Sequence, residues 1–290
     1  MAAIDISMGL PSHVDGVTRT QLIKWAREAE DMGAHSLCTT DRVMYPSLET
    51  MLTLAAVSSV TVRAKLMTSV LVAPLRTNSA LFRKQIYTLD LLTDHRLVLA
   101  VGVGRRHDDY DACGVDYRRR GKILDEQLSA EDSPPYPGTT GAGPSISDLL
   151  GTRLLISGQS PATLGRVARH GGGWVAPAGQ GGWSGTTAAF ADDVRKAWAT
   201  AGRPGTPRLV AMIYTSAGLH AREEALQHIH RYYAFLGREG AEKLASSVIT
   251  DAGQLAETRD QVAEAGFHEL LLLPTSADLV QLEALKTALG

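Results

Sequence analysis

The fold is decided by the stretch KLMTSVLVAPLRTNSALFRKQIYTLDLLTDHRLVLAVGVG, residues Lys65–Gly104. It contains a β-rich run at Lys65–Val72 and an amphipathic run at Ser79–Leu92, whose apolar residues recur three and four positions apart. A second β-rich run follows at Arg96–Val103. A strand, a helix and a strand in this order predict two parallel strands joined by a helical crossover.

The same alternation continues from end to end of the chain. The other runs with strand character are Ile4–Gly9, Ser36–Thr40, Arg153–Ser157, Gly173–Ala176, Arg208–Thr215 and Glu269–Leu273. The other helical runs are Thr20–Met32, Leu48–Val60, Pro161–His170, Thr186–Ala201, Ala221–Leu236, Glu239–Ser247, Gly253–Ala265 and Ala277–Leu289. Eight strands followed by helices predict an α/β fold, a (β/α)8 TIM barrel with the single domain 1–290. A doubly wound sheet fits less well, because it usually has fewer strands and no GxGxxG fingerprint follows the first strand.

One segment interrupts this alternation. Residues 131–148 read EDSPPYPGTTGAGPSISD and are rich in proline, glycine, serine and threonine. Such a segment buries too little apolar surface to fold alone, so it predicts a long loop between the fourth helix and the fifth strand. The loop could be a plain connector or a lid over an active site.

Composition excludes several classes of protein. Of the 290 residues, 44% are hydrophobic and 21% are charged, which excludes a disordered chain, a collagen-like fibre and a coiled-coil rod. A net charge of −2 predicts no attraction to nucleic acid or to an anionic membrane. Two cysteines are too few for a disulfide scaffold, and no apolar run reaches the ~18 residues of a membrane span. The N-terminus lacks a signal-peptide pattern, so we expect a cytoplasmic protein.

Candidate site residues follow from the strand ends, because a barrel of this kind forms its active site at the carboxyl ends of its strands. The second strand ends at Asp41 and Arg42. A carboxylate there can accept a hydrogen bond or act as a base, and an arginine can hold an anion or a carbonyl oxygen. The alternative is an ion pair that only stabilises the rim of the barrel.

The fourth strand leads into Gly102, Val103 and Gly104. Two of these positions lack a Cβ atom, so the backbone can approach a planar ligand closely. Arg105 and His107 follow and could meet a phosphate group. They could equally be solvated among the neighbouring aspartates.

The fifth strand leads into Ser157, Gly158, Gln159 and Ser160. Ser160 is at an N-cap position with proline next to it, and the N-terminus of a helix presents free N–H groups to an anion. Capping without any ligand is the alternative interpretation.

Other residue types carry no site prediction. His228 and His230 are two positions apart on a helical run and diverge, and HExxH is absent, so we expect no metal site. No GxSxG elbow of a hydrolase is present. The aromatic pair Tyr232 and Tyr233 is interpreted as core or as subunit interface.

Five segments, in this order, resemble the bacterial luciferase-like flavin-dependent oxidoreductases. They are AREAEDMGAHSLCTTDR (Ala26–Arg42), the stretch from Thr68 to Gly104 quoted above, GVDYRRRGKILDE (Gly114–Glu126), LLISGQSPATLGRVARHGGGWVAP (Leu154–Pro177) and HELLLLP (His268–Pro274). The resemblance covers nearly the whole chain. It implies a (β/α)8 barrel, in agreement with the strand count.

The resemblance implies a reduced flavin at the mouth of the barrel, either FMN or the deazaflavin coenzyme F-420. Members that use FMN are typically monooxygenases that receive reduced flavin from a separate reductase. Members that use the deazaflavin transfer hydride to or from it. Members are commonly homodimers, and the resemblance implies a small organic substrate. A barrel that binds flavin without catalysis is a third alternative.

Roles of single residues are implied by the resemblance as well. Asp41 would lie beside the edge of the flavin ring. Ser69 and Val70 would form a backbone bulge behind the ring, often with a non-proline cis peptide. Gly102–Gly104 would line the ring or the ribityl chain, with Arg105 beside them.

The same resemblance places the phosphate group on the fifth strand's loop, formed by Ser157, Gly158, Gln159 and Ser160. Trp174 would belong to the family's usual gating motif on the sixth strand. These residues complete the cofactor site that the sequence predicts.

This chain departs from the family's pattern. Many deazaflavin members have a histidine where this chain has Arg42, and the usual Gly-Asp-Gly-Trp is Gly171–Trp174 without the aspartate. The usual Gly-Gly before the phosphate-site serine is also missing. The first interpretation is therefore a two-component monooxygenase that uses reduced FMN and O2, with Asp41, Arg42 and His107 as candidate catalytic residues. Hydride transfer with coenzyme F-420 is the alternative.

Overall fold

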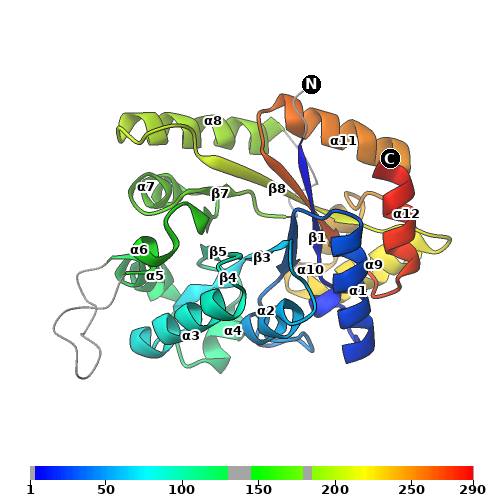
Figure 1. Ribbon diagram of the computed structural model, residues 1–290, viewed down its shortest axis with the longest axis horizontal. Coiled ribbons are helices and arrows are strands. Elements are labelled where there is room, and N and C mark those ends of the chain that lie inside the picture. Colours follow the sequence, from blue (N-terminus) through cyan, green and yellow to red (C-terminus); the bar gives the residue numbers. More distant parts are fainter. Residues whose placement is uncertain (1–3, 130–144, 179–184, 290) are drawn as a thin grey trace.

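Nine parallel strands form one sheet that closes on itself in the computed structural model, which describes residues 4–129, 145–178 and 185–289 (Figure 1). The strands are β1 (Asp5–Gly9), β2 (Ser36–Thr39), β3 (Lys65–Thr68), β4 (Leu71–Val72), β5 (Leu97–Gly102), β6 (Leu154–Ser157), β7 (Gly173–Val175), β8 (Arg208–Thr215) and β9 (Glu269–Pro274). They pair in the order β3-β2-β1-β9-β8-β7-β6-β5-β4, and pairing of β3 with β5 closes the ring. Because β3 and β4 share one place in the ring, the barrel has eight positions. The predicted (β/α)8 TIM barrel is confirmed.

Helices surround the barrel (Figure 1). They are α1 (Arg19–Asp31), α2 (Thr50–Ser58), α3 (Ser79–Leu92), α4 (His107–Ala112), α5 (Arg120–Leu128), α6 (Ile146–Leu150), α7 (Pro161–Arg169), α8 (Gly185–Thr200), α9 (Ala221–Tyr232), α10 (Gly237–Ala245), α11 (Ala252–Glu264) and α12 (Val280–Leu289). Several of them begin at a side-chain cap: the Thr18 side chain accepts from the N–H of Gln21 ahead of α1, and Asn78 accepts from Leu81 ahead of α3.

The run Lys65–Val72, predicted as one strand, is divided into β3 and β4. Met67 pairs with Val98, and Leu71 pairs with Val101. Four steps along this run (67 to 71) therefore oppose three steps along β5 (98 to 101). One extra residue of this kind is a β-bulge, which bends the strand and re-aims its side chains.

The bulge lies at Ser69 and Val70, where the resemblance placed it. The peptide bond between these two residues is cis. The backbone N–H and the hydroxyl of Ser69 both donate to the carbonyl oxygen of Thr39, at 2.6 and 3.0 Å. A serine with these two bonds leaves the regular ladder without losing its partners, which is why a run with strand composition is interrupted here.

Two further predictions need correction. The helix predicted over Ala221–Leu236 ends at Tyr232, and a 3-10 turn follows at Ala234–Leu236. At residues 145–148, predicted as the end of a loop, Ser145 caps α6 in a capping box with Asp148. The rest of that loop, residues 131–144, lies outside the described residues.

The interior of the barrel is filled by side chains from all sides. Its fully buried members include Cys38, Met67, Val98, Ala100, Leu155, Val175, Val210 and Leu271. A second, larger core lies between the strands and the helices and contains Trp25, Phe82 and Trp174. Because the interior is packed, a ligand has room at the mouth of the barrel and not in a central channel.

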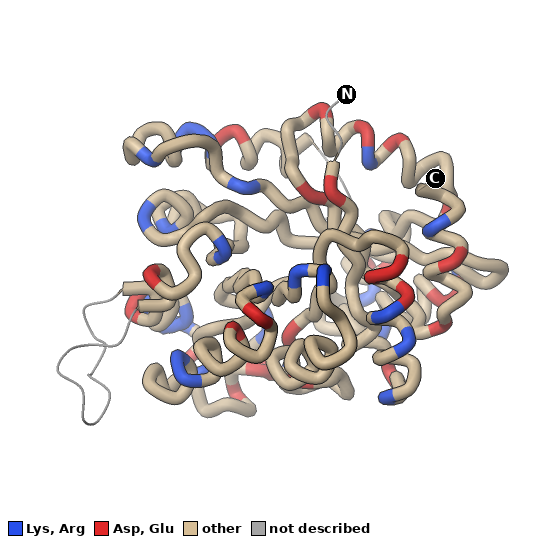
Figure 2. The backbone as a smooth tube through the Cα atoms, in the orientation of Figure 1, with Lys and Arg blue, Asp and Glu red and all other residues tan. Residues whose placement is uncertain are grey.

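Charges of both signs alternate along the outer elements of the described chain, and no face of a single sign stands out in the view of Figure 2. Among the described residues, no helix combines the length and apolar character that a membrane crossing requires.

Candidate active site

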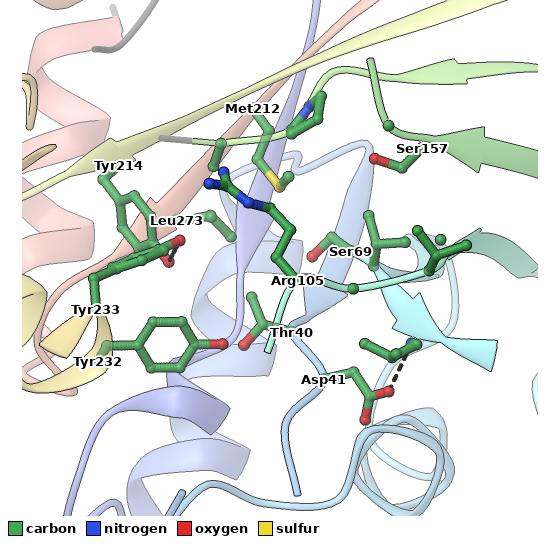
Figure 3. Close-up of a pocket in the computed structure, with 18 residues that line it drawn as sticks. Thr40, Asp41, Ser69, Arg105, Ser157, Met212, Tyr214, Tyr232, Tyr233 and Leu273 are labelled. Atoms are coloured by element: carbon green, nitrogen blue, oxygen red, sulfur yellow. Dashed lines mark hydrogen bonds between the residues drawn. The ribbon is translucent and has the colours of Figure 1, made fainter. Parts of the chain in front are cut away.

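A pocket opens at the carboxyl ends of the strands, and we call it the mouth pocket. Its walls consist of Thr40, Asp41, Ser69, Val70, Val72, Gly102, Val103, Gly104, Arg105, Ser157, Gly158, Pro177, Ala178, Met212, Tyr214, Tyr232, Tyr233 and Leu273 (Figure 3). A second hollow, the side pocket, shares part of this wall and adds Arg42, Arg106, Asp109, Tyr110, Phe235 and Leu236. Most of the strand-end residues that the sequence predicted are thus brought together.

One wall of the mouth pocket is built from backbone and glycine, and we call it the glycine wall. Gly102 ends β5, and a Cβ atom there would lie only 3.3 Å from Cγ1 of Val70. At Gly158 a Cβ atom would lie 2.8 Å from Oγ1 of Thr163. The cis peptide of Ser69 and Val70 belongs to the same wall. A surface without Cβ atoms lets a flat ring approach the backbone closely.

Asp41 is buried two residues beyond the end of β2 and faces the mouth pocket. Its carboxylate accepts a hydrogen bond from the N–H of Val72 at 2.8 Å, drawn in Figure 3, and from Nη2 of Arg76 at 3.0 Å. Both carboxylate oxygens are engaged, so Asp41 ties β4 to β2 and holds the bulge between them. Its role toward a cofactor stays a prediction.

Arg42 lines the side pocket, and its guanidinium is only 3% exposed. It donates to the carbonyl oxygens of Met44 and Tyr232, at 2.7 and 3.2 Å, and pairs with Asp108 at 3.3 Å and Asp109 at 3.6 Å. Asp41 and Arg42 therefore form two separate ion pairs at the rim. A catalytic role for Arg42 stays a prediction. To bind a substrate oxygen, its guanidinium would have to give up some of these bonds.

His107 and Arg105 lie apart although they are close in sequence. His107 is exposed at the start of α4 and stacks on Tyr117 with ring centroids 3.7 Å apart, outside the walls of both pockets. The Arg105 side chain extends over the mouth pocket (Figure 3). Of the two, only Arg105 is placed to meet a ligand there.

The loop after β6 contributes Ser157 and Gly158 to the pocket, while Gln159 and Ser160 are exposed beyond it. The hydroxyl of Ser157 donates to the carbonyl oxygen of Val175 at 2.9 Å. Ser160 caps α7 as predicted, accepting from the N–H of Thr163. The free N–H groups of α7 therefore begin at the edge of the mouth pocket, where an anion can bind.

Trp174 does not reach the mouth pocket. Its ring is fully buried in the outer core, 5.0 Å from the ring of Phe190. Its indole N–H donates to the carbonyl oxygen of Gly158 at 2.8 Å. Trp174 therefore supports the loop after β6 from behind, and direct contact with a cofactor stays a prediction.

The profile of the luciferase-like monooxygenase family matches residues 6–276. The chain belongs to the luciferase-like monooxygenase family. This match confirms the resemblance drawn from the sequence and the expectation of an enzyme. An uncharacterised protein of Mycobacterium tuberculosis is 29% identical over 193 residues, which cover 53% of this chain and 66% of the relative. The chain thus spans just under two thirds of the length of this relative.

Solved structures of luciferase-like proteins share the fold. The monooxygenase RslO1 from Streptomyces bottropensis superimposes with a TM-score of 0.72 at 16% identity, over 99% of this chain and 98% of that one. An F420-dependent secondary alcohol dehydrogenase gives 0.71 at 14% identity, over 98% of each chain. The oxygenating constituent of 3,6-diketocamphane monooxygenase from Pseudomonas putida, in complex with FMN, gives 0.65 at 14% identity, over 98% and 96%. At these identities the likeness shows the fold alone.

The wall opposite the glycine wall was not predicted as part of this luciferase-like site. It consists of Met212 and Tyr214 from β8, Leu273 from β9, and Tyr232 and Tyr233 at the end of α9. The interpretation of the tyrosine pair as core is confirmed for Tyr232, which is buried, and Tyr233 packs against the inner core. Both rings also line the pocket, which was not predicted. Tyr214 lies at the end of a predicted strand, where strand-end reasoning expects site residues, although the sequence assigned it no role.

Behind this wall lies a buried histidine, His13. Its ring centroid is 5.0 Å from that of His228, 5.6 Å from that of Tyr232 and 6.1 Å from that of Tyr214. Burial lowers the pKa of His13 to about 4, and burial also lowers the pKa of His228. Both rings are therefore neutral parts of the aromatic packing at neutral pH.

His13 should make the folded protein sensitive to acid. Above pH 6.5 the ring is neutral in the folded and the unfolded chain alike. Between pH 6.5 and about 4 only the unfolded chain binds the proton, so the free energy of unfolding falls as the pH falls, by about 3 kcal/mol in total. Urea unfolding at pH 7 and pH 4.5 should show a smaller difference for His13→Phe than for the wild type.

His230→Phe is the matched control, because His230 lies on the exposed side of α9. It should keep the acid sensitivity of the wild type. An unchanged acid sensitivity in His13→Phe would contradict the prediction.

Within the described residues, no group of three or more histidine, cysteine, aspartate or glutamate side chains gathers as a metal site would require. The residues that face the mouth pocket instead suit a flat organic ring with an anionic tail.

Proposed function

We propose that this protein is a flavin-dependent oxidoreductase, and specifically the oxygenating component of a two-component monooxygenase that takes reduced FMN and O2. The observation that carries the proposal is the glycine wall, where Gly102, Gly104 and Gly158 line the pocket without side chains. A flavin ring fits such a surface because side chains do not hold it away from the backbone.

The residues divide the work of binding. The glycine wall would take one face of the ring, and Asp41 would lie at its edge. The loop from Ser157 to Ser160 with the N-terminus of α7 would take the phosphate group, aided by Arg105. When bound, reduced FMN supplies the electrons that activate O2. A separate reductase would deliver it.

The opposite wall would receive the substrate. Met212, Leu273 and the tyrosine rings are largely apolar and buried, so they exclude water from the space beside the ring. We therefore propose a small organic substrate.

Hydride transfer with coenzyme F-420 is the second candidate, since the glycine wall accepts either kind of flat ring. The F420-dependent dehydrogenase shares the fold as closely as the monooxygenase RslO1 does. No histidine stands among the described residues that line the mouth pocket. Because a histidine beside Asp41 is the pattern of many deazaflavin members, its replacement by Arg42 favours FMN.

Titration of the purified protein with oxidised and reduced FMN and with oxidised and reduced F-420 tests the proposal. Fluorescence quenching and the melting temperature report binding, and a ligand at one hundred times its Kd stabilises by ~2.7 kcal/mol. Tighter binding of reduced FMN, with O2 consumption, supports the monooxygenase. Preference for F-420 replaces it with the hydride-transfer enzyme. No binding of any of the four would leave a barrel without flavin chemistry.

We also propose that the protein is a homodimer, joined through α2 and α3. These helices present exposed apolar side chains in the monomer: Leu52 is 73% exposed, and Leu91 and Leu92 are each 58% exposed. An apolar hollow between the two helices includes Met51 and Leu89. Exposed apolar side chains that gather in one patch, unlike single leucines scattered over a surface, are typical of a surface that a partner covers.

The double variant Leu52→Glu/Leu92→Glu should therefore become monomeric. Size-exclusion chromatography with light scattering should give twice 31.0 kDa for the wild type and 31.0 kDa for this variant. Leu219→Glu, at a site 93% exposed before α9, is the control and should remain dimeric. A monomeric wild type at micromolar concentration would refute the dimer.

A further inference from the structure

Two hydroxyl groups meet on the otherwise apolar substrate wall of the mouth pocket. Tyr214 comes from β8 and Tyr233 from the residue after α9, and Figure 3 shows both rings beside each other, across the pocket from Ser157 and Asp41. Their hydroxyl oxygens are 3.1 Å apart, so one donates a hydrogen bond to the other. Met212 and Leu273 surround them.

The pair has one hydrogen-bond donor to spare. Two hydroxyls carry two protons, and the bond between them uses one. No partner for the second proton stands among the described residues. A partly buried donor without a partner among these residues gains a hydrogen bond when a ligand oxygen enters the pocket.

The two rings are held in place by their neighbours. The Tyr214 and Tyr233 rings meet edge to face, with centroids 5.9 Å apart at 89°. Tyr233 also contacts Tyr232 at 5.0 Å, and Tyr214 contacts His13 at 6.1 Å. The spare donor is therefore preorganised, since little rotation of either ring is open to it.

The pair is uncharged. Burial raises the pKa of both Tyr214 and Tyr233, so both hydroxyls stay protonated at neutral pH. Of the three cations near Tyr233, Arg42 and Arg106 are engaged with Asp108 at the side pocket. The third, Arg105, extends over the mouth pocket, where we assign it to the phosphate group of the cofactor. The substrate wall thus offers a neutral donor in apolar surroundings, which suits a neutral acceptor better than an anion.

We propose that the Tyr214–Tyr233 hydroxyl pair hydrogen-bonds a neutral oxygen of the substrate, a carbonyl or a hydroxyl, and holds the oxygen-bearing carbon toward the glycine wall. This inference rests on the proposed function, because it assigns the substrate to the wall opposite the flavin. It makes the pair a specificity determinant for small ketones, aldehydes or alcohols over hydrocarbons of the same shape.

The single and double phenylalanine variants test the pair. Either single variant, Tyr214→Phe or Tyr233→Phe, keeps one hydroxyl that can donate to the ligand, so each should weaken ketone binding only slightly. The double variant keeps none and should weaken it about tenfold, more than the product of the two single effects. The probes are cyclohexanone and acetophenone, with methylenecyclohexane and α-methylstyrene as oxygen-free isosteres.

Binding is measured by ligand-observed NMR on the protein saturated with FMN or F-420, whichever binds. Infrared spectra of 13C-labelled acetophenone supply a readout that packing alone would not move: the carbonyl stretch of the bound ketone should be lower in the wild type than in the double variant, where it should approach its value in an apolar solvent. Tyr87→Phe, an exposed tyrosine on α3, should change nothing.

Three results would overturn the inference. They are an equal loss for the ketone and its isostere in the double variant, the same carbonyl stretch for ketone bound to the wild type and to the double variant, and failure of both ketones to bind at millimolar concentration. Failure of the flavin to bind is a separate result, which removes the proposed function while the infrared test on the flavin-free protein still decides whether the pair holds a carbonyl. Melting temperatures show whether each variant is folded.

Discussion

Replacing Glu269 by alanine is expected to lower the free energy of unfolding by about 3–5 kcal/mol. Glu269 begins β9 at the amino end of the barrel and is 1% exposed. Its carboxylate accepts from the hydroxyl of Ser7 and pairs with the guanidinium of Arg208. Ser7 in turn accepts from the N–H of Ser36 at 3.0 Å, so one network ties β1, β2, β8 and β9 together.

The size of the effect comes from what alanine leaves behind. Arg208 would lose its carboxylate although its side chain is only 19% exposed, and Ser7 would lose its acceptor inside the barrel. An unpaired buried charge costs far more than the net value of the original pair. Urea unfolding monitored by circular dichroism gives the difference directly.

Glu283→Ala on α12 is the matched control, since Glu283 is exposed. It should change the free energy of unfolding by less than about 0.5 kcal/mol. Folded Glu269→Ala protein should bind flavin like the wild type, because the network lies at the end of the barrel opposite to the mouth. A variant as stable as Glu283→Ala would show that water replaces the carboxylate without cost.

The barrel could be predicted because its signals are local. Each strand is an apolar run of fitting length, and several helices begin at side-chain caps such as Thr18 and Asn78. The predicted range Ser79–Leu92 coincides with α3. A fold that repeats one strand–helix unit can be predicted once each unit is recognised from its own stretch of sequence.

Local composition could not predict two places where the structure departs from the predicted strands and helices, the bulge between β3 and β4 and the end of α9. Ser69 and Val70 have the composition of a strand, and the bulge there depends on the carbonyl oxygen of Thr39, a neighbour distant in sequence. The end of α9 at Tyr232 depends likewise on packing of the two tyrosines against His13 and Tyr214. Tertiary contacts override propensity at such positions.

The candidate site, too, could be predicted only where its residues follow from local sequence. Strand-end reasoning found one side of the mouth pocket, including Asp41 and Gly102, because Gly102 ends β5 and Asp41 lies two residues beyond the end of β2. It could not find Tyr233, which comes from a helix end, or show that His107 turns away to stack on Tyr117. Side chains on loops and helix ends reach the mouth only through the folded geometry.

Replacing Gly102 by valine is expected to weaken binding of reduced FMN at least about 100-fold, or ~2.7 kcal/mol. Gly102 is the last residue of β5 and lies in the glycine wall, so an isopropyl group there would occupy the space of the ring. The backbone at Gly102 has no positive φ, and the nearest atom to a new Cβ is Cγ1 of the half-buried Val70 at 3.3 Å. A small shift of that side chain would keep the strand in place.

The variant therefore separates binding from folding. Gly185→Val is the matched control, because a Cβ atom at Gly185 meets nothing within 4 Å and this residue, the first of α8, is not among those that line the mouth pocket. Without flavin, Gly185→Val should melt near the wild-type temperature, and Gly102→Val should melt somewhat lower, because Gly102 is buried and a valine there crowds Val70 and Ser157. Only Gly102→Val should lose the rise in melting temperature that reduced FMN gives. A Kd within threefold of the wild type would mean that the flavin does not lie on the glycine wall. The ring would then have to pack against the tyrosine side, and the substrate wall and the cofactor wall would exchange places.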